Sequence, residues 1–175
     1  MERTAEARWF FPGRATPAQI AWFAQGERAE HEKRRTDRYL DLAGNPDLGI
    51  KQREGKLELK ARAAKARAFR LAGIAGRKDA WVKWSTALRG TTRLPGRWLP
   101  VAKARMVLSL PGCDVELARL EALGRRFFSL GFEATSTASL DRALARFFAV
   151  RGLMPGARLV AGRALSYPEW LASLR

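Results

Sequence analysis

The chain has little cysteine and histidine: Cys113 and His31 are the only residues of either type among its 175 residues. One cysteine excludes an intramolecular disulfide, and the two residues together are too few for a Cys/His zinc site. Any metal would therefore be held by carboxylate oxygens, which favour hard cations such as Mg²⁺ or Mn²⁺. Long apolar runs are also missing, and no basic segment followed by an apolar stretch opens the chain. We therefore expect a cytoplasmic protein with no membrane partner.

Negative charge is scarce as well. The sequence has 33 Lys and Arg residues against 17 Asp and Glu residues, a formal net charge of +16, and a pI of about 11.3. Such an excess is self-repulsive unless an anion offsets it, so nucleic acid, nucleotides and polyphosphate are the expected partners. The chain is 47% hydrophobic, which at this length predicts one domain with a substantial core.

The segment from Leu48 to Arg62 alternates strictly and contains Glu54-Gly55 at its centre, which predicts a β-hairpin with a two-residue turn. The two strands would then share one charged face. That face carries Lys51, Arg53, Lys56, Glu58, Lys60 and Arg62. The solvated face of an ordinary antiparallel sheet is sufficient to explain a single hairpin of this kind.

Other segments predict further strands and three helices. Strands are expected over residues 6–11, 36–42, 80–85, 98–110, 113–120 and 127–134, with a break at 72–76. Helices are expected over residues 17–25 and 139–150 and, as a short terminal helix, near 166–171, because capping residues or helical spacing of apolar residues mark each one. The charged segment at residues 30–35 fits either a solvated loop or a nucleic-acid-binding tract.

Charged residues two positions apart, and so on one strand face, recur along these strands. They are Glu6 and Arg8, Lys51 and Arg53, Glu58, Lys60 and Arg62, and Lys103 and Arg105. A one-sided sheet explains one or two such pairs. Many converging basic strands would repel one another unless they surround a bound polyanion, which favours a closed barrel with a charged interior.

These strands resemble the motifs of the CYTH superfamily, the triphosphate tunnel metalloenzymes, in the same order along the chain. The similar segments are Thr4-Ala5-Glu6-Ala7-Arg8, Asp37-Arg38-Tyr39-Leu40-Asp41, Leu48-Gly49-Ile50-Lys51-Gln52-Arg53, Leu57-Glu58-Leu59-Lys60, Lys103-Ala104-Arg105, Val115-Glu116-Leu117 and Gly131-Phe132-Glu133. Each motif is short, and together they span residues 4–134.

The resemblance implies an α+β fold, a closed antiparallel β-barrel of about eight strands that forms a tunnel, with flanking helices. It implies a single CYTH-like domain over residues 1–175, with barrel strands within 4–134 and C-terminal helices within 137–175. The implied activity is metal-dependent hydrolysis of inorganic triphosphate, a nucleoside triphosphate or thiamine triphosphate in the basic barrel interior, with Mg²⁺ or Mn²⁺ as cofactor.

The same resemblance assigns roles to individual residues. The catalytic set is Glu6, Glu116, Glu133 and Lys60. The substrate-binding set is Arg8, Lys51, Arg53, Lys60, Arg62, Lys83, Lys103 and Arg105. The metal-binding set is Glu6, Glu116, Glu133 and Glu58.

The first strand departs from the family pattern. Thr4 stands where the signature has a glutamate, and Arg8 stands where it has a lysine, which differs from arginine in shape and hydration. An expected metal-ligating carboxylate is therefore missing. Two alternatives stay open for this reason: a CYTH-like protein that binds a phosphorylated ligand without turnover, and a basic domain that binds nucleic acid.

Overall fold

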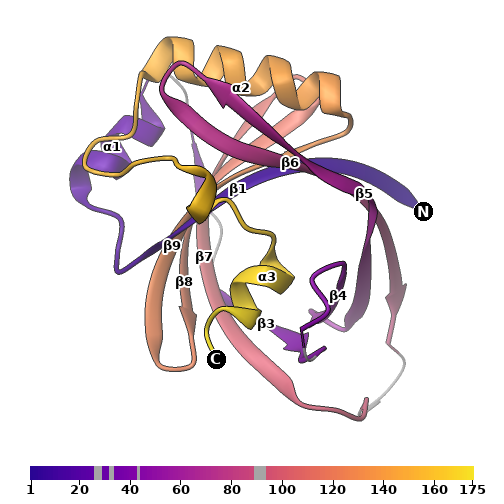
Figure 1. Cartoon of the computed structure of the whole chain (residues 1–175). Coiled ribbons are helices and arrows are strands. Elements are labelled where there is room, and N and C mark those ends of the chain that lie inside the picture. The colour runs from indigo at the N-terminus through magenta and orange to yellow at the C-terminus, as the bar shows by residue number, and fades with distance from the viewer. Residues whose placement is uncertain (26–28, 32–33, 43, 89–93) are drawn as a thin grey trace.

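The computed structural model describes residues 1–25, 29–31, 34–42, 44–88 and 94–175. These residues form nine strands and three α-helices (Figure 1). The strands are β1 (Glu2–Pro12), β2 (Glu30–His31), β3 (Arg35–Leu40), β4 (Leu48–Arg53), β5 (Lys56–Leu71), β6 (Ile74–Ala87), β7 (Trp98–Leu110), β8 (Cys113–Ala122) and β9 (Arg125–Ala134). The helices are α1 (Pro17–Ala24), α2 (Thr137–Arg151) and α3 (Tyr167–Ala172), with a 3₁₀ turn η1 (Ala161–Arg163).

Eight strands close into an antiparallel barrel. Their order is β7-β3-β4-β5-β6-β1-β9-β8, and pairing between β7 and β8 completes the ring, while the short β2 adds to β7. The barrel strands lie between residues 2 and 134, with α2 and α3 after them. The expected fold, a closed antiparallel barrel with flanking helices, is therefore confirmed.

The hairpin predicted at Glu54-Gly55 is present. Both turn residues have positive φ, 48° and 73°, and the pair Ala72-Gly73 has φ of 42° and 84°. A two-residue turn with both residues in the left-handed region matches the twist of the flanking strands. The second turn also corrects the sequence interpretation. The chain from residue 63 continues β5 to Leu71, turns at Ala72-Gly73 and returns as β6. The break expected at 72–76 is therefore a two-residue turn, and the strand expected at 80–85 begins at Ile74.

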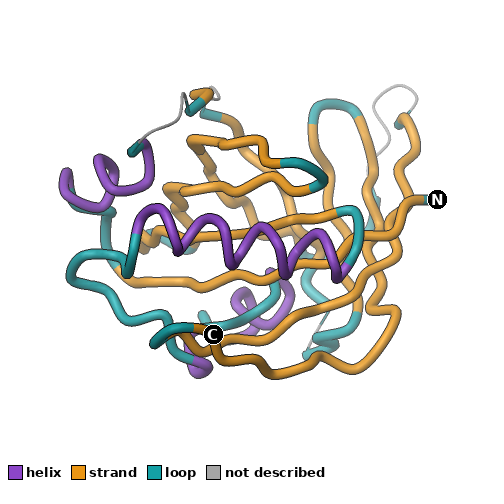
Figure 2. The backbone as a smooth tube through the Cα atoms, turned by 90° about the horizontal axis from the view of Figure 1, so that it is seen from above, coloured by secondary structure: helices purple, strands orange, loops and turns teal. Residues whose placement is uncertain are grey.

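The main apolar core lies outside the barrel wall. Alternate residues of β1, including Ala7 and Trp9, face outward and pack with Phe132 of β9 and with Phe147 of α2. Helix α2 lies across the outer face of the strands, as seen in Figure 2. Because the outward face of the sheet is covered by a helix, the other face of the same strands is left to line the barrel interior. No helix in the described part of the chain is long and apolar enough to cross a membrane.

A second apolar cluster fills one end of the barrel. Trp170 and Leu171 of α3 pack there against Phe10, Tyr39 and Phe127, which face inward from β1, β3 and β9. Figure 1 shows α3 within the ring of strands. Its N-terminus has a capping box between Ser166 and Glu169, as the sequence predicted. The remaining interior space therefore forms a cavity with α3 at one end.

Candidate functional site

The barrel interior contains a cavity of about 470 Å³, a size typical of small-molecule sites. Side chains from β1 and from β3 to β9 line it, together with the residues that start α3. The charged lining residues are Glu2, Glu6, Arg8, Arg35, Lys51, Arg53, Glu58, Lys60, Lys83, Lys103, Arg105, Asp114, Glu116 and Glu133. Eight cations therefore face six carboxylates, so the described lining has a formal excess of only two positive charges.

Nearly every predicted site residue reaches this cavity. Eleven line it: Glu6, Arg8, Lys51, Arg53, Glu58, Lys60, Lys83, Lys103, Arg105, Glu116 and Glu133. Arg62 does not. Its guanidinium pairs with Asp79, with Asp47 at 2.6 Å and with Glu169 at 3.5 Å. Arg62 is on the same strand face as Lys60, since the two are in register with Trp81 and Lys83 of β6, but its ion pairs with Asp79 and Glu169 hold its guanidinium away from the cavity.

Sequence reasoning missed several lining residues. Trp81 lies opposite Thr4 in the β1–β6 register and lines the cavity beside it. Its position two residues before Lys83 places both side chains on one strand face, which was a usable signal. Tyr167 also lines the cavity, but no local signal identifies it, because its position depends on where α3 sits in the barrel.

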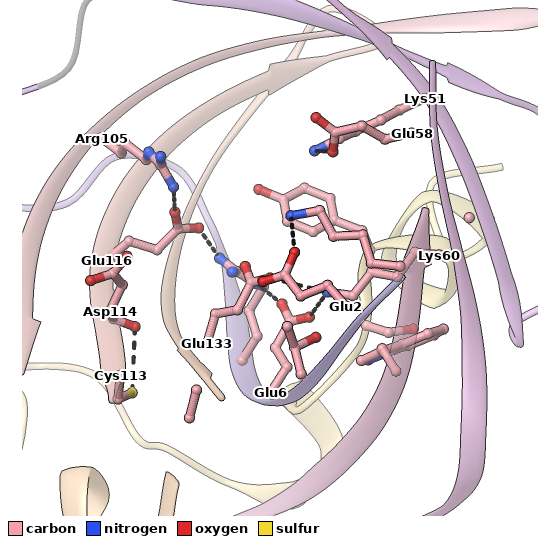
Figure 3. A pocket seen from close by; sticks show the side chains of 18 of the residues that line it. Glu2, Glu6, Lys51, Glu58, Lys60, Arg105, Cys113, Asp114, Glu116 and Glu133 are labelled. Atoms are coloured by element: carbon pink, nitrogen blue, oxygen red, sulfur yellow. Dashed lines mark hydrogen bonds and ion pairs between the residues drawn. The ribbon is translucent and has the colours of Figure 1, made fainter. Parts of the chain in front are cut away.

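Most of the interior cations are already paired with carboxylates. Glu58 accepts from Lys51 and Arg53, each at 2.9 Å, and Figure 3 shows Lys51 and Glu58 side by side. Glu6 accepts from Lys60 at 2.5 Å, and Figure 3 shows Arg105 directed at Glu116, at 2.7 Å. The interior is therefore a network of ion pairs rather than a set of free cations.

The network fixes the ionisation of its buried carboxyls. Burial raises the pKa of Glu6, but the charges of Lys60 and Arg8 outweigh it and lower that pKa to about 2. Burial opposes ionisation of Glu116 too, yet Arg8, Lys103 and Arg105 hold its pKa well below the ordinary value. Both groups are carboxylates near neutral pH.

Five cations of the network also reach the open part of the cavity. The side chains of Lys51, Arg53, Lys60, Lys83 and Arg105 are between 23% and 27% exposed. By contrast, Arg8 and Lys103 are buried with at most 7% of each side chain exposed. An anion that enters the cavity therefore meets the five partly exposed cations first.

Tyr167 forms the α3 side of the cavity. Its hydroxyl lies 3.1 Å from the Lys103 ammonium, which donates to it, and the Arg8 guanidinium lies 5.0 Å from its ring centre. The ring also stacks on Tyr39, with centroids 5.5 Å apart. These contacts hold two buried cations against an aromatic surface, which favours their charged forms.

The carboxylates do not fit a divalent cation. No group of three or more acidic, Cys or His side chains within the described residues converges as a metal site. Glu6, Glu58 and Glu116 each accept from two or three cations, and Glu133 lies 3.9 Å from the Lys60 ammonium. A divalent cation requires several unneutralised oxygens, so the four residues expected to bind a metal form no such site.

Most of the positive charge lies outside the cavity. Among the described residues, those that do not line it include 21 Lys and Arg against 9 Asp and Glu. Exposed members include Arg14, Arg34, Arg119 and Arg126, which line a shared groove near the ends of β8 and β9 with a single acidic residue, Glu121. Among the described residues, those outside the cavity therefore carry a formal excess of 12 positive charges (21 − 9), against two for the cavity lining.

No protein family and no curated protein matches the chain in sequence. Solved structures do share its fold. A conserved hypothetical protein from Pyrococcus furiosus is 13% identical with a TM-score of 0.53, over 95% of this chain and 98% of that one. A Pyrococcus horikoshii protein is 14% identical with a TM-score of 0.51 and the same coverage of both chains.

A third similar structure has a described activity. It is a putative adenylyl cyclase from Hippeastrum with a dominant triphosphatase activity, 12% identical with a TM-score of 0.51 over 100% of this chain and 97% of that one. At this identity the likeness establishes the fold alone. The chain thus has the barrel fold that its resemblance to the CYTH superfamily implied.

Proposed function

We propose that the protein binds the phosphate chain of a triphosphate-containing small molecule inside the barrel. The observation that carries this proposal is the convergence of eight cations from different strands on one cavity. Five of them are partly exposed to that cavity, so their donors are accessible to phosphate oxygens. The +16 charge of the whole chain also favours entry of a polyanion whose charge exceeds the local excess of two.

Calorimetric titration with inorganic tripolyphosphate tests this proposal. Replacing Arg53 with Met removes one cavity donor, and a lost hydrogen bond to a charged group costs about 1.5–3 kcal/mol, or about 10- to 150-fold in affinity. Arg119→Met is the matched control, because it removes the same charge from an exposed position on β8 outside the cavity. Equal weakening by both variants would show that the ligand responds to net charge and not to the cavity.

We further propose that the protein hydrolyses the phosphate chain that it binds. The fold shared with the Hippeastrum triphosphatase supports it, whereas the paired carboxylates offer no ready cation site. Phosphate release from tripolyphosphate, ATP and thiamine triphosphate is the relevant assay, run with Mg²⁺, with Mn²⁺ and with EDTA. Release that disappears in Arg53→Met supports a hydrolase, and tight binding without release supports a non-catalytic binder.

The exterior charge supports a separate candidate, nucleic-acid binding. The groove lined by Arg14, Arg34, Arg119 and Arg126 presents guanidinium groups that suit a phosphodiester backbone. A fluorescent single-stranded oligonucleotide measures this directly, because backbone binding weakens steeply as salt increases. Competition by tripolyphosphate distinguishes the two sites: a ligand in the cavity would leave oligonucleotide binding unchanged.

A further inference from the structure

Arg8 joins two buried carboxylates of the cavity that come from different strands. Its Nε donates to Oε1 of Glu6 at 2.8 Å, and its Nη1 donates to Oε1 of Glu116. All three side chains are at most 7% exposed. Glu6 and Arg8 come from β1 and Glu116 from β8, so the guanidinium reaches across the intervening strand β9.

Gly131 makes that reach feasible. In the strand registers Gly131 of β9 is paired with Arg8 on one side and with Glu116 on the other, so the three residues form one row across the barrel wall. A Cβ atom at Gly131 would lie under 3.0 Å from the Arg8 guanidinium. The guanidinium therefore occupies the space that a side chain on β9 would fill.

Every carboxylate oxygen of this pair has a cationic partner. Glu6 Oε1 accepts from Arg8 and its Oε2 accepts from Lys60. Glu116 Oε1 accepts from Arg8 and from Lys103, and its Oε2 accepts from Arg105. A divalent cation at this pair would have to displace Arg8 and Lys103, which are both buried, at a large electrostatic cost.

Two neutral donors of the cavity lining have no hydrogen-bond partner among the described residues. The Thr4 hydroxyl and the Trp81 indole N–H are buried without a hydrogen bond, and both residues line the cavity opposite each other on β1 and β6. A buried donor without a partner is costly, and a phosphate oxygen would satisfy it. Thr4 is also the position at which the family signature has an acid, so a potential metal ligand is replaced here by a hydroxyl.

We infer that this cavity binds its phosphate ligand without a bridging divalent cation, because the Arg8 guanidinium occupies the position between Glu6 and Glu116 as a built-in cation. This inference rests on the proposed function. The phosphate chain is held by the partly exposed cations and by the Thr4 and Trp81 donors, and Arg8 keeps the two acidic residues neutralised beneath it.

Titration of the wild-type protein with tripolyphosphate, once in EDTA and once in excess MgCl₂, tests the inference. The expected result is no loss of affinity in EDTA, since Mg²⁺ only neutralises part of the ligand charge. Binding confined to the MgCl₂ sample overturns the inference and leaves the proposed function intact. Absence of binding in both samples overturns the proposed function and the inference with it.

Manganese binding to the ligand-free protein gives an independent readout. Free Mn²⁺ has an electron paramagnetic resonance signal that is lost on binding, and the wild-type protein is expected to leave it at full amplitude. Signal loss in the wild type overturns the inference. Arg8→Met frees Oε1 of Glu6 and removes one of the two cations at Oε1 of Glu116, so it is expected to reduce the signal. Lys83→Met is expected to leave the signal unchanged, because Lys83 contacts only the exposed Glu2 carboxylate, at 3.6 Å, among its described partners.

Discussion

Gly131→Ala is the most informative single substitution in the barrel. Gly131 has an ordinary negative φ, and alanine in a strand interior is intrinsically better than glycine by about 0.5–1 kcal/mol. The added Cβ, however, meets the Arg8 guanidinium, which must move away from Glu116. Breaking a buried ion pair costs about 3 kcal/mol or more, so a net destabilisation of about 2–2.5 kcal/mol is expected, with the thermal midpoint falling by about 4–10 °C.

A double-mutant cycle isolates the cause of that loss. In an Arg8→Met background the guanidinium is absent, so the additional cost of Gly131→Ala should fall to less than about 1 kcal/mol, measured by urea unfolding. Gly162→Ala is the control for a general glycine effect, because a Cβ there has open space around it and the backbone φ is not positive. An equal cost of Gly131→Ala in both backgrounds would refute the assigned role of Gly131.

Further expectations concern acid, the buried donors and salt. In the folded protein the pKa of Glu6 is lowered from 4.5 to about 2, so ionised Glu6 contributes about 3 kcal/mol to the free energy of unfolding above about pH 5. This stability should be lost as pH falls from 5 toward 2, as measured by urea unfolding, and a flat pH profile over that range contradicts the ion-pair network. Thr4→Val should raise stability by about 1 kcal/mol, since it removes an unpaired buried hydroxyl, and should weaken tripolyphosphate binding; unchanged affinity removes Thr4 from the site. Oligonucleotide binding should weaken with salt, and Arg119→Met together with Arg126→Met should reduce the slope of that dependence by about two; an unaltered slope rules out the exterior groove.

Turns and helices that are determined by residues close together in the sequence could be predicted from it. Glu54-Gly55 was identified as a turn because few residue pairs suit a two-residue hairpin, and the helix α2 was identified from the spacing of Leu140, Leu144, Phe147 and Phe148. Ala72-Gly73 forms the same kind of turn, but the sequence interpretation treated the glycine-containing stretch 72–76 as a break only. Alanine is rare at positive φ, so its presence does not indicate a two-residue hairpin turn.

Closure of the barrel was predicted from charge and family resemblance, not from any single strand. Repeated charged pairs indicated an enclosed interior, but the pairing of β7 with β8 that closes it is a long-range contact that no local pattern encodes. The same limit explains Arg62. Alternation placed its side chain with Lys60, whereas its partners Asp47, Asp79 and Glu169 come from a loop, from β6 and from α3.

The ion pairing between acidic and basic residues inside the barrel was the feature hardest to predict from the sequence. The resemblance to the CYTH superfamily assigned Glu6, Arg8 and Glu116 to one site, and it implied that the acidic residues bind metal while the basic ones bind phosphate. Whether the two groups pair with each other depends on strand order and on the absence of a side chain at Gly131 between Arg8 and Glu116. Those facts follow from the register of β1, β9 and β8 and are not visible in separate motifs.

A crystal structure of the protein with inorganic tripolyphosphate in EDTA tests the central claim most directly. The account predicts the phosphate chain inside the barrel, in contact with Lys51, Arg53 and Arg105, with Arg8 still between Glu6 and Glu116. Tripolyphosphate bound only at exterior arginines, with the barrel cavity holding none, would contradict it.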